Sequence, residues 1–311
     1  MTRFSPPSDP CAPSVTAAEA PAEPAAEPLD PLAMIPADWP HRAASRRVPL
    51  DGAVWHVQEV GTGPVLLLLH GTGGSTHSWA PIIDRLGARY RCIAVDLPGH
   101  GFTDVPADPT WYTIPGMAQG LGRLLRTLGI TPHRVAGHSA GVPVLLQMAR
   151  LGLIAPDRII GVNPALIPPP ATYMTLLAPL LSAMVEPEPV ARGGAWLARG
   201  TRLIEWMLAT SGSRLTPEQL ARYRWLCERP GHVHAALTMM ARWDLPRLLR
   251  DVAALTVPLE IFAGSRDRWV PPRPLAAIAD GLPFARFHTL TGGHLLPEEH
   301  PDQVAEVLCH P

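Results

Sequence analysis

The chain has no lysine: its 311 residues include 26 basic side chains, and all of them are arginine. This absence excludes a Schiff-base lysine and the phosphate-binding lysine of a P-loop. The dinucleotide-binding string G-x-G-x-x-G is also missing, so the sequence contains no nucleotide-binding motif of either kind. The net charge is only −1, which gives no electrostatic reason to expect a nucleic-acid partner.

Cysteine is scarce, and its positions show neither metal-ligand nor redox spacing: Cys11, Cys92, Cys227 and Cys309. We interpret them as ordinary thiols of a reducing compartment and expect a cytoplasmic protein. Outside the glycine-rich loops, the only close pair of histidines is His232 and His234, and no carboxylate or cysteine cluster accompanies it. The sequence therefore predicts no metal site and no bound cofactor.

We expect neither a targeting segment nor a membrane-spanning segment from this sequence. Arg3 is not followed by an apolar core, so we expect no secretory signal peptide. Residues 159–185 carry no charge, but five prolines interrupt them, so we expect no transmembrane helix. Residues 1–38 are rich in Pro, Ala and Glu, and we predict a disordered tail because they cannot bury enough apolar surface to offset their ordering entropy.

The most informative motif is Gly-His-Ser-Ala-Gly at residues 137–141. It follows an apolar run at 134–136 and precedes an apolar stretch at 142–148, which predicts a strand, a sharp turn and a helix. In such a turn the serine has strained backbone geometry that exposes its hydroxyl above the sheet, and glycine fits where strand and helix crowd together. Ser139 is therefore the candidate nucleophile.

The other catalytic residues are sought by chain order, because hydrolases with this elbow carry the acid and then the histidine further along. Asp267 follows an apolar strand that ends at Gly264, and His294 follows a strand beginning at Phe287 and a glycine turn. Open α/β sheets place active sites on such loops, at the carboxyl ends of strands. We predict that His294 accepts the Ser139 proton and that Asp267 orients the imidazole.

Other residues compete for these two roles. Asp244 is expected to start a helix and Asp280 to lie within one, so both are weaker candidates for the acid. His288 is expected inside a strand, and His300 lies beyond the turn that carries His294. Further polar residues near the loops are interpreted as structural, namely His70, His138, Asp96 and His100. Four tryptophans are interpreted as core residues or as pocket lining: Trp79, Trp206, Trp225 and Trp243.

An oxyanion hole is expected from a second glycine-rich segment. The apolar run at residues 65–69 is typical of a strand buried on both faces, and the loop at 70–74 follows it directly. This loop can direct backbone N–H groups toward the elbow. We predict that the N–H groups of Thr72 and Ala140 stabilise the oxyanion.

The rest of the chain from Trp39 alternates between strand and helix patterns. Strands are expected at 46–50, 54–60, 65–69, 92–95 and 158–162, with helices near 79–86 and 115–128. This alternation indicates a mostly parallel sheet covered on both faces.

The alternation stops at residues 164–242, which we predict to be a helical cap, so that residues 39–163 and 243–311 form the core. Two interpretations of the cap stay open. In the first, the inner face of the cap only packs against the core. In the second, the cap forms an apolar lid over a hydrophobic substrate pocket and touches a membrane surface.

Several segments carry a resemblance to known proteins. Residues 55–58, 63–73, 75–79 and 96–103 resemble the α/β-hydrolase superfamily. Residues 137–141 and three cap segments are similar to the magnesium-chelatase accessory proteins of bacteriochlorophyll biosynthesis; the cap segments are 212–215, 230–233 and 239–245. The resemblance runs from Trp39 to the C-terminus. It implies the α/β-hydrolase fold, with a mostly parallel central sheet, helices on both faces and a helical cap inserted before the strand carrying the acid.

The resemblance implies a role in photosynthetic bacteria near the magnesium-chelation step, with chelatase subunits as partners, a tetrapyrrole as ligand and a place at the photosynthetic membrane. Two classes of function stay open: a serine hydrolase acting on an ester or related acyl group of a hydrophobic substrate, or a non-catalytic module that binds a porphyrin or docks on the chelatase. Serine at the elbow argues against epoxide hydrolases and haloalkane dehalogenases of this fold, which need a carboxylate there. Cofactor-free haloperoxidases share the serine triad and stay open as well.

Overall fold

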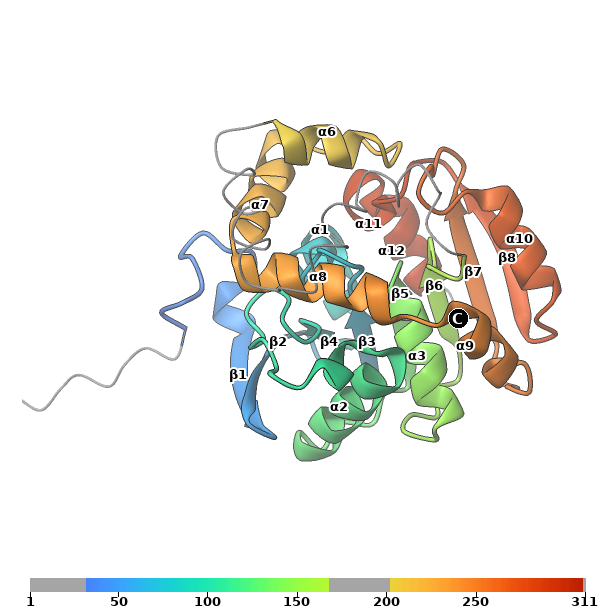
Figure 1. Ribbon diagram of the computed structural model, residues 1–311, viewed down its shortest axis with the longest axis horizontal. Coiled ribbons are helices and arrows are strands. Elements are labelled where there is room, and N and C mark those ends of the chain that lie inside the picture. Colours follow the sequence, from blue (N-terminus) through green and yellow to red (C-terminus); the bar gives the residue numbers. More distant parts are fainter. Residues whose placement is uncertain (1–31, 168–201, 310–311) are drawn as a thin grey trace, which may run out of the picture. The chain divides into compact units, whose positions relative to one another are not determined.

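The structure is a computed structural model that describes residues 32–167 and 202–309. Eight strands form one sheet in the order β1-β2-β4-β3-β5-β6-β7-β8 (Figure 1). β1 and β2 form an antiparallel hairpin, β2 is antiparallel to β4, and all other neighbours are parallel. The predicted mostly parallel sheet is confirmed. The strands are β1 (Ser45–Leu50), β2 (Ala53–Val60), β3 (Val65–Leu69), β4 (Arg91–Val95), β5 (Arg134–His138), β6 (Ile159–Val162), β7 (Leu259–Gly264) and β8 (Ala285–Leu290).

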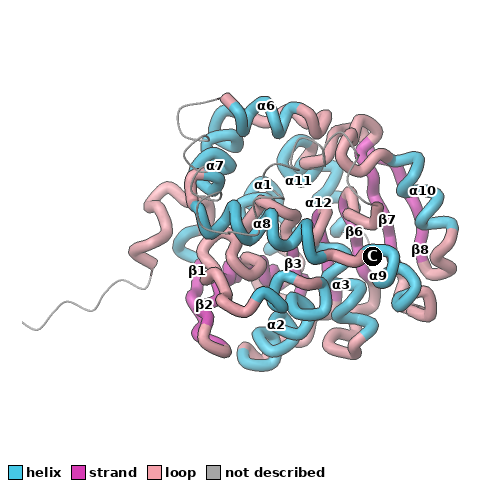
Figure 2. The backbone as a smooth tube through the Cα atoms, viewed as in Figure 1, coloured by secondary structure: helices cyan, strands magenta, loops and turns pink. Residues whose placement is uncertain are grey.

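Helices cover both faces of the sheet (Figure 2). One face packs against α1 (Ala80–Gly87), α11 (Leu296–Glu299) and α12 (Pro301–Cys309). The other packs against α2 (Ile114–Thr127), α3 (Gly141–Arg150), α9 (Leu245–Val252) and α10 (Pro272–Asp280). Short 3-10 helices occupy Arg42–Ala44, Thr76–Trp79 and Pro109–Tyr112.

The central strand β3 shows why the sheet needs two helical layers. Leu66 and Leu68 point into one core cluster, whereas Leu67 and Leu69 point into the other. Alternate side chains of a strand face opposite sides, so a continuous apolar run must be covered twice. The prediction of a strand buried on both faces is confirmed.

The described part of the predicted cap is helical and lies between β6 and β7 in the chain (Figure 1). Its helices are α6 (Leu203–Ala209), α7 (Pro217–Cys227) and α8 (Pro230–Arg242). α7 begins with a capping box, in which Thr216 and Gln219 satisfy each other's backbone N–H groups. Residues 168–201 of the predicted cap lie outside the described residues.

The predicted tail requires one correction. Residues 32–38 were assigned to a disordered segment, yet Ile35 is 2% exposed and packs in one cluster with Trp39, Phe102 and Leu226. Arg42 also donates to the Ile35 carbonyl. The composition of the segment hid these long-range apolar contacts. Residues 1–31 lie outside the described residues.

Two smaller points concern side chains and membranes. Trp79 is fully buried, whereas Trp206 on α6 is 52% exposed, so the tryptophans do not share one role. In the portion of the chain that the structure describes, no helix combines the length and apolarity needed to cross a bilayer.

Candidate active site

The predicted nucleophile Ser139 lies in the turn between β5 and α3. Its φ is +47°, in the left-handed region that L side chains rarely adopt. Ser139 N donates to Val162 O at 2.9 Å, and Ala165 N donates to Ser139 O at 3.0 Å. The turn therefore has the strained geometry that the motif predicts, and the end of β6 holds it in place.

Close packing requires the glycines on either side of the serine. A Cβ on Gly137 would lie 2.7 Å from Val142 N, and one on Gly141 would lie 2.4 Å from Leu69 O. Both distances are shorter than a van der Waals contact, so any larger residue would force strand and helix apart. This is the crowding expected from the Gly-x-Ser-x-Gly pattern.

The structure brings Ser139, Asp267 and His294 together at the carboxyl ends of β5, β7 and β8, and all three are buried. His294 Nδ1 donates to Asp267 Oδ2 at 2.7 Å, and His294 Nε2 lies 3.0 Å from Ser139 Oγ. Asp267 Oδ1 accepts the backbone N–H groups of Trp269 and Val270, each at 2.8 Å. Because an ionised carboxylate can only accept, Nδ1 is the donor of this pair, and Nε2 is the ring nitrogen that faces the hydroxyl.

The competing acids and histidines lie elsewhere. Asp244 caps α9 through its carboxylate, and Asp280 is the last residue of α10. His288 lies in β8, where its Nε2 is 2.7 Å from Glu260 Oε2, and His300 is the C-cap that follows α11. Among the described residues, none of these four is hydrogen bonded to Ser139, Asp267 or His294.

Two side chains hold the backbone of His294. Asn163, at φ +46° after β6, donates from Nδ2 to Gly293 O (2.9 Å) and His294 O (2.7 Å), and its Oδ1 accepts Gly264 N at 2.6 Å. His138 Nε2 donates to the same His294 carbonyl at 2.8 Å. Burial, and then the charge of His294, lowers the pKa of His138 to about 3, so it is neutral at pH 7.

The sequence analysis assigned His138 a structural role but missed Asn163. The available signal was its position: a polar residue directly after a buried strand at the edge where the loops meet.

The two predicted oxyanion donors lie beside the nucleophile. Ala140 follows Ser139 and is the N-cap of α3. A Cβ on Gly71 would lie 2.9 Å from the Ser139 Cβ, so the loop that carries Thr72 packs directly against the elbow. Among the hydrogen bonds between described residues, neither the Thr72 nor the Ala140 N–H has an acceptor.

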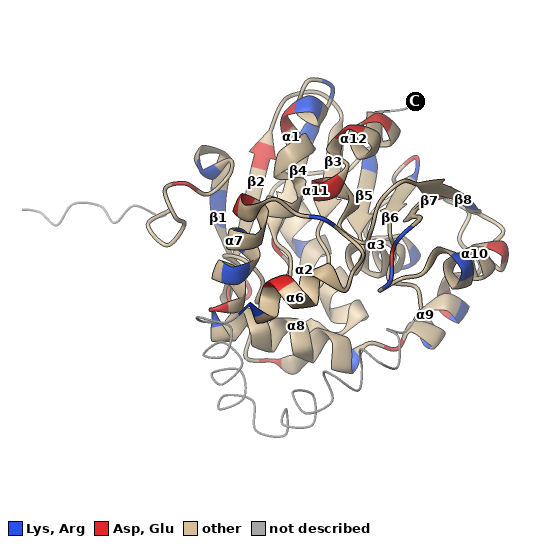
Figure 3. Cartoon of the chain, turned by 90° about the horizontal axis from the view of Figure 1, so that it is seen from above, with Lys and Arg blue, Asp and Glu red and all other residues tan. Residues whose placement is uncertain are grey.

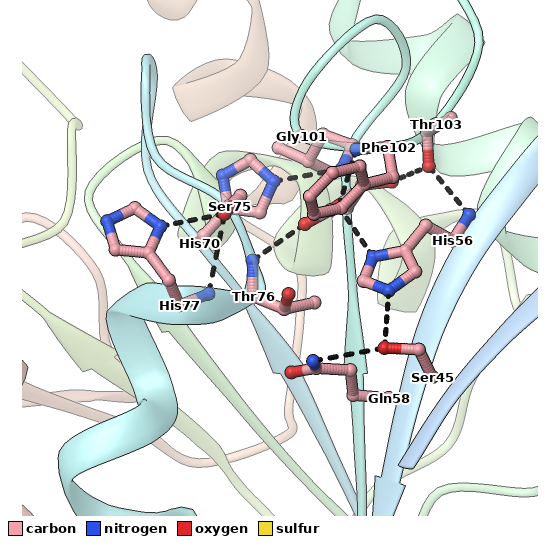
Figure 4. Close-up of polar contacts among 12 residues, drawn as sticks. Ser45, His56, Gln58, His70, Ser75, Thr76, His77, Gly101, Phe102 and Thr103 are labelled. Atoms are coloured by element: carbon pink, nitrogen blue, oxygen red, sulfur yellow. Dashed lines mark hydrogen bonds and ion pairs between the residues drawn. The ribbon is translucent and has the colours of Figure 1, made fainter. Parts of the chain in front are cut away.

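The buried carboxylate of Asp96 joins the loop after β4 to the 3-10 helix that follows the glycine-rich loop, and its partners His56, Thr76 and Phe102 are labelled in Figure 4. Asp96 Oδ1 accepts Thr76 N at 2.6 Å, and Oδ2 accepts Phe102 N at 2.9 Å and His56 Nδ1 at 2.6 Å. Burial would raise the pKa of Asp96, but the charge and hydrogen bond of His56 outweigh it and hold that pKa well below its usual range. Asp96 thus has the loop-fixing role expected.

The neighbouring histidines are held in the same way. His70 Nδ1 donates to Gly71 O at 2.7 Å, and its Nε2 accepts Leu97 N at 2.9 Å. Burial lowers the pKa of His70. His100 Nδ1 donates to Pro98 O at 3.1 Å. These contacts agree with structural rather than catalytic roles for His70 and His100.

The loop after α6 ties the cap to both triad loops. Ser211 O accepts the N–H of Arg268, next to the acid, at 3.2 Å, and the N–H of His294 at 3.3 Å. Ser213 Oγ accepts Leu295 N at 2.8 Å. A segment far from the core strands in sequence therefore helps to set the position of the histidine.

His232, one residue of the close histidine pair, is engaged in contacts with two loops of the core. His232 Nε2 donates to Gly73 O and Nδ1 accepts Gly101 N, both at 3.1 Å, so neither nitrogen faces a vacant site. Burial lowers the pKa of His232 to about 4. The described residues contain no group of three or more His, Cys, Asp or Glu side chains placed to hold a metal ion.

The fold and this site define the class of protein. A model of the alpha/beta hydrolase family matches residues 66–307, and the chain belongs to that family. An alpha/beta hydrolase fold protein from Burkholderia ambifaria superimposes with a TM-score of 0.72 at 26% identity, covering 86% of this chain and 97% of that one.

Two named relatives from other bacteria are similar to most of this chain. The magnesium-chelatase 30 kDa subunit of Rhodobacter capsulatus is 38% identical over 286 residues, which cover 90% of this chain and 98% of that protein. The pimeloyl-(acyl-carrier protein) methyl ester esterase of Xanthomonas campestris pv. campestris (strain B100) is 32% identical over 266 residues, covering 81% and 96%. The resemblance seen in the sequence is confirmed, cap included.

Proposed function

We propose that this chain is a serine hydrolase that cleaves an ester or related acyl bond of a hydrophobic substrate. Ser139 attacks the carbonyl carbon, His294 takes the serine proton and returns it to the leaving group, and Asp267 orients the imidazole. The Thr72 and Ala140 N–H groups stabilise the oxyanion. Water then attacks the acyl-enzyme, again with His294 as base, and releases the acid.

The observation that carries this proposal is the 3.0 Å contact between Ser139 Oγ and His294 Nε2, backed by the 2.7 Å bond from Nδ1 to Asp267. Serine rather than a carboxylate at the elbow favours acyl transfer over the alkyl-ester chemistry of dehalogenases and epoxide hydrolases. The similarity to a methyl ester esterase supports the same reaction class.

Hydrolysis of 4-nitrophenyl esters of increasing chain length tests the proposal. Ser139→Ala and His294→Ala should each lose about 10⁴-fold or more in kcat, and Asp267→Asn somewhat less. His288→Ala, which removes the competing histidine of β8, should retain wild-type rates. Equal rates in the wild type and Ser139→Ala would refute it.

The second candidate is a binding module, favoured by the 38% identity to a protein named a magnesium-chelatase subunit. In this alternative the chain holds a porphyrin or docks on chelatase subunits near the magnesium-insertion step of bacteriochlorophyll biosynthesis. Porphyrin-dependent quenching of tryptophan fluorescence, with no esterase activity and full pigment rescue by Ser139→Ala, would favour it.

We also propose a cytoplasmic location with peripheral contact at the photosynthetic membrane through the cap. Support comes from α6, where Leu203 and Trp206 are 37% and 52% exposed. Apolar and aromatic side chains of this kind insert at the headgroup boundary. In a flotation assay with anionic lipid vesicles, the wild type should be recovered in the vesicle fraction. The Trp206→Ser variant should stay in the fraction without vesicles.

A further inference from the structure

A pocket of about 600 Å³ lies between the loop after α6 in the cap and the loop after β7 that carries Asp267 (the acid loop). Neither Ser139 nor His294 lines it. Its volume is in the range of small-molecule sites. Its charged and polar lining comes from the loop after α6 and the loop after β7: Ser213, Arg214, Ser265, Arg266, Asp267 and Arg268. In Figure 3 both loops carry blue segments that mark basic residues. Three arginines therefore line one concavity.

The two loops are fixed to each other. Gly212 has φ +83°, and a Cβ there would lie 2.0 Å from Arg266 O, so the two backbones are in direct contact. Arg268 N donates to Ser211 O at 3.2 Å. Arginines held on a rigid frame bind a ligand at lower entropic cost than arginines on free loops. The two loops that line the pocket are thus joined through their backbones.

The charge at the pocket is positive and only partly neutralised. Arg266 Nη2 is 2.7 Å from Glu299 Oε1, whereas Arg214 and Arg268 lie within ion-pair distance of no carboxylate among the described residues. The Asp267 side chain is fully buried, and both of its oxygens are engaged in the bonds given above. Its carboxylate therefore offers no free partner to the arginines.

We propose that this pocket binds a small organic anion that carries two or more carboxylate or phosphate groups. Guanidinium groups recognise these groups through paired, charge-assisted hydrogen bonds. Two arginines without a carboxylate partner among the described residues, together with the pocket's volume, match a polyanion larger than an inorganic ion. The pocket shares Asp267 with the predicted ester site, but neither Ser139 nor His294 lines it, and ligand binding there does not depend on hydrolysis by Ser139.

Calorimetric titration of the full chain carrying Ser139→Ala, at low salt, tests this proposal with citrate as the probe. Saturable 1:1 binding is expected, and it should weaken about tenfold or more in Arg214→Ala and in Arg268→Ala. Arg126→Ala removes the same charge from an exposed position on α2 and is the matched control. Triethyl citrate keeps the carbon skeleton without charge and should not bind, and inorganic phosphate should bind more weakly than citrate.

Three results would overturn the proposal. Citrate fails to saturate, or Arg126→Ala weakens binding as much as Arg268→Ala, which would indicate non-specific charge attraction. Alternatively, polyglutamate binds while citrate does not, which would make the pocket part of a docking surface for an acidic protein. Because the Ser139→Ala background has no nucleophile, none of these outcomes depends on whether the chain hydrolyses esters.

Discussion

Ser139 occupies a backbone conformation that costs about 1–3 kcal/mol in a folded protein. Its φ of +47° is supported by the hydrogen bonds of its backbone to Val162 and Ala165 and by the close packing of Gly71 against it. A protein that only bound a ligand would have no physical need to hold a serine there. The strained conformation places the Ser139 hydroxyl against Nε2 of the His294 imidazole, the base that the proposed reaction requires.

Asn163 supports this arrangement at the same scale. We predict that Asn163→Gly lowers kcat at least tenfold while changing KM little, because the His294 carbonyl loses one of its two side-chain donors and the imidazole is less well placed. Glycine tolerates the +46° φ of this position, so the substitution removes the hydrogen bonds without adding backbone strain. Esterase kinetics measured beside a thermal melt check the prediction.

The control for this variant is Asn163→Asp, which keeps the acceptor for Gly264 N but loses both donors. It should behave like Asn163→Gly if the donors matter. Unchanged kcat in both variants would mean that His138 alone holds the His294 backbone.

At the scale of elements, the loop between α6 and α7 connects the cap to the loops after β7 and β8. Gly212 lies at its centre, in contact with Arg266 O, between the Ser211 and Ser213 contacts to the histidine loop. We predict that Gly212→Ala lowers both kcat and stability, because the added Cβ must displace the acid loop.

Gly152→Ala is the matched control for this substitution. Gly152 also has positive φ, +66°, but nothing lies within 4 Å of its Cβ position, so the control measures only the cost of the backbone conformation, about 1–2 kcal/mol. Denaturant unfolding and kinetics of both variants make the comparison. Equal losses in the two proteins would show that the cap loop does not position the triad.

The elements also show what sequence can and cannot predict here. β3, the elbow and the strands before Asp267 and His294 were predictable because apolar periodicity and glycine turns are local signals. The contacts of Asn163 and Ser211 with the histidine loop were not, because they join segments about 80 to 130 residues apart in the chain. The burial of Ile35 was missed for the same reason.

At the scale of the whole molecule, one buried acid links the cap to the core. Glu298 on α11 accepts Tyr223 Oη of α7 at 2.5 Å, and Gln219 Nε2 donates to its backbone carbonyl. Burial raises the pKa of Glu298 to about 8, against the lowering effects of the Tyr223 bond and the Arg222 charge. Burial also lowers the pKa of the adjacent His77 to about 3, so no imidazolium compensates Glu298 at neutral pH.

The pH dependence follows from linkage. The folded state keeps the Glu298 proton up to about pH 8, whereas the unfolded chain releases it near pH 4.5. This acid therefore makes wild-type stability fall as pH rises from about 4.5 to 8, by at most about 1.4 kcal/mol per pH unit. Glu298→Gln, which can still accept from Tyr223, should gain stability relative to the wild type as pH rises through that window.

Urea unfolding of both proteins at pH 5, 6, 7 and 8 measures the difference in their free energies of unfolding. The contributions of the buried histidines cancel in this difference because both proteins contain them. Glu306→Gln, a change at an exposed position of α12, should show a difference that is flat with pH. A flat difference for Glu298→Gln as well would contradict the raised pKa of Glu298.

The central claim is that Ser139 is an activated nucleophile, and covalent labelling tests it most directly. A fluorophosphonate probe reacts with serines whose proton is removed by a neighbouring base. Peptide mapping of the labelled wild type should place one adduct on Ser139, and the folded Ser139→Ala protein should carry none. A folded wild type that takes up no probe, or a Ser139→Ala protein labelled to the same extent, would contradict the account.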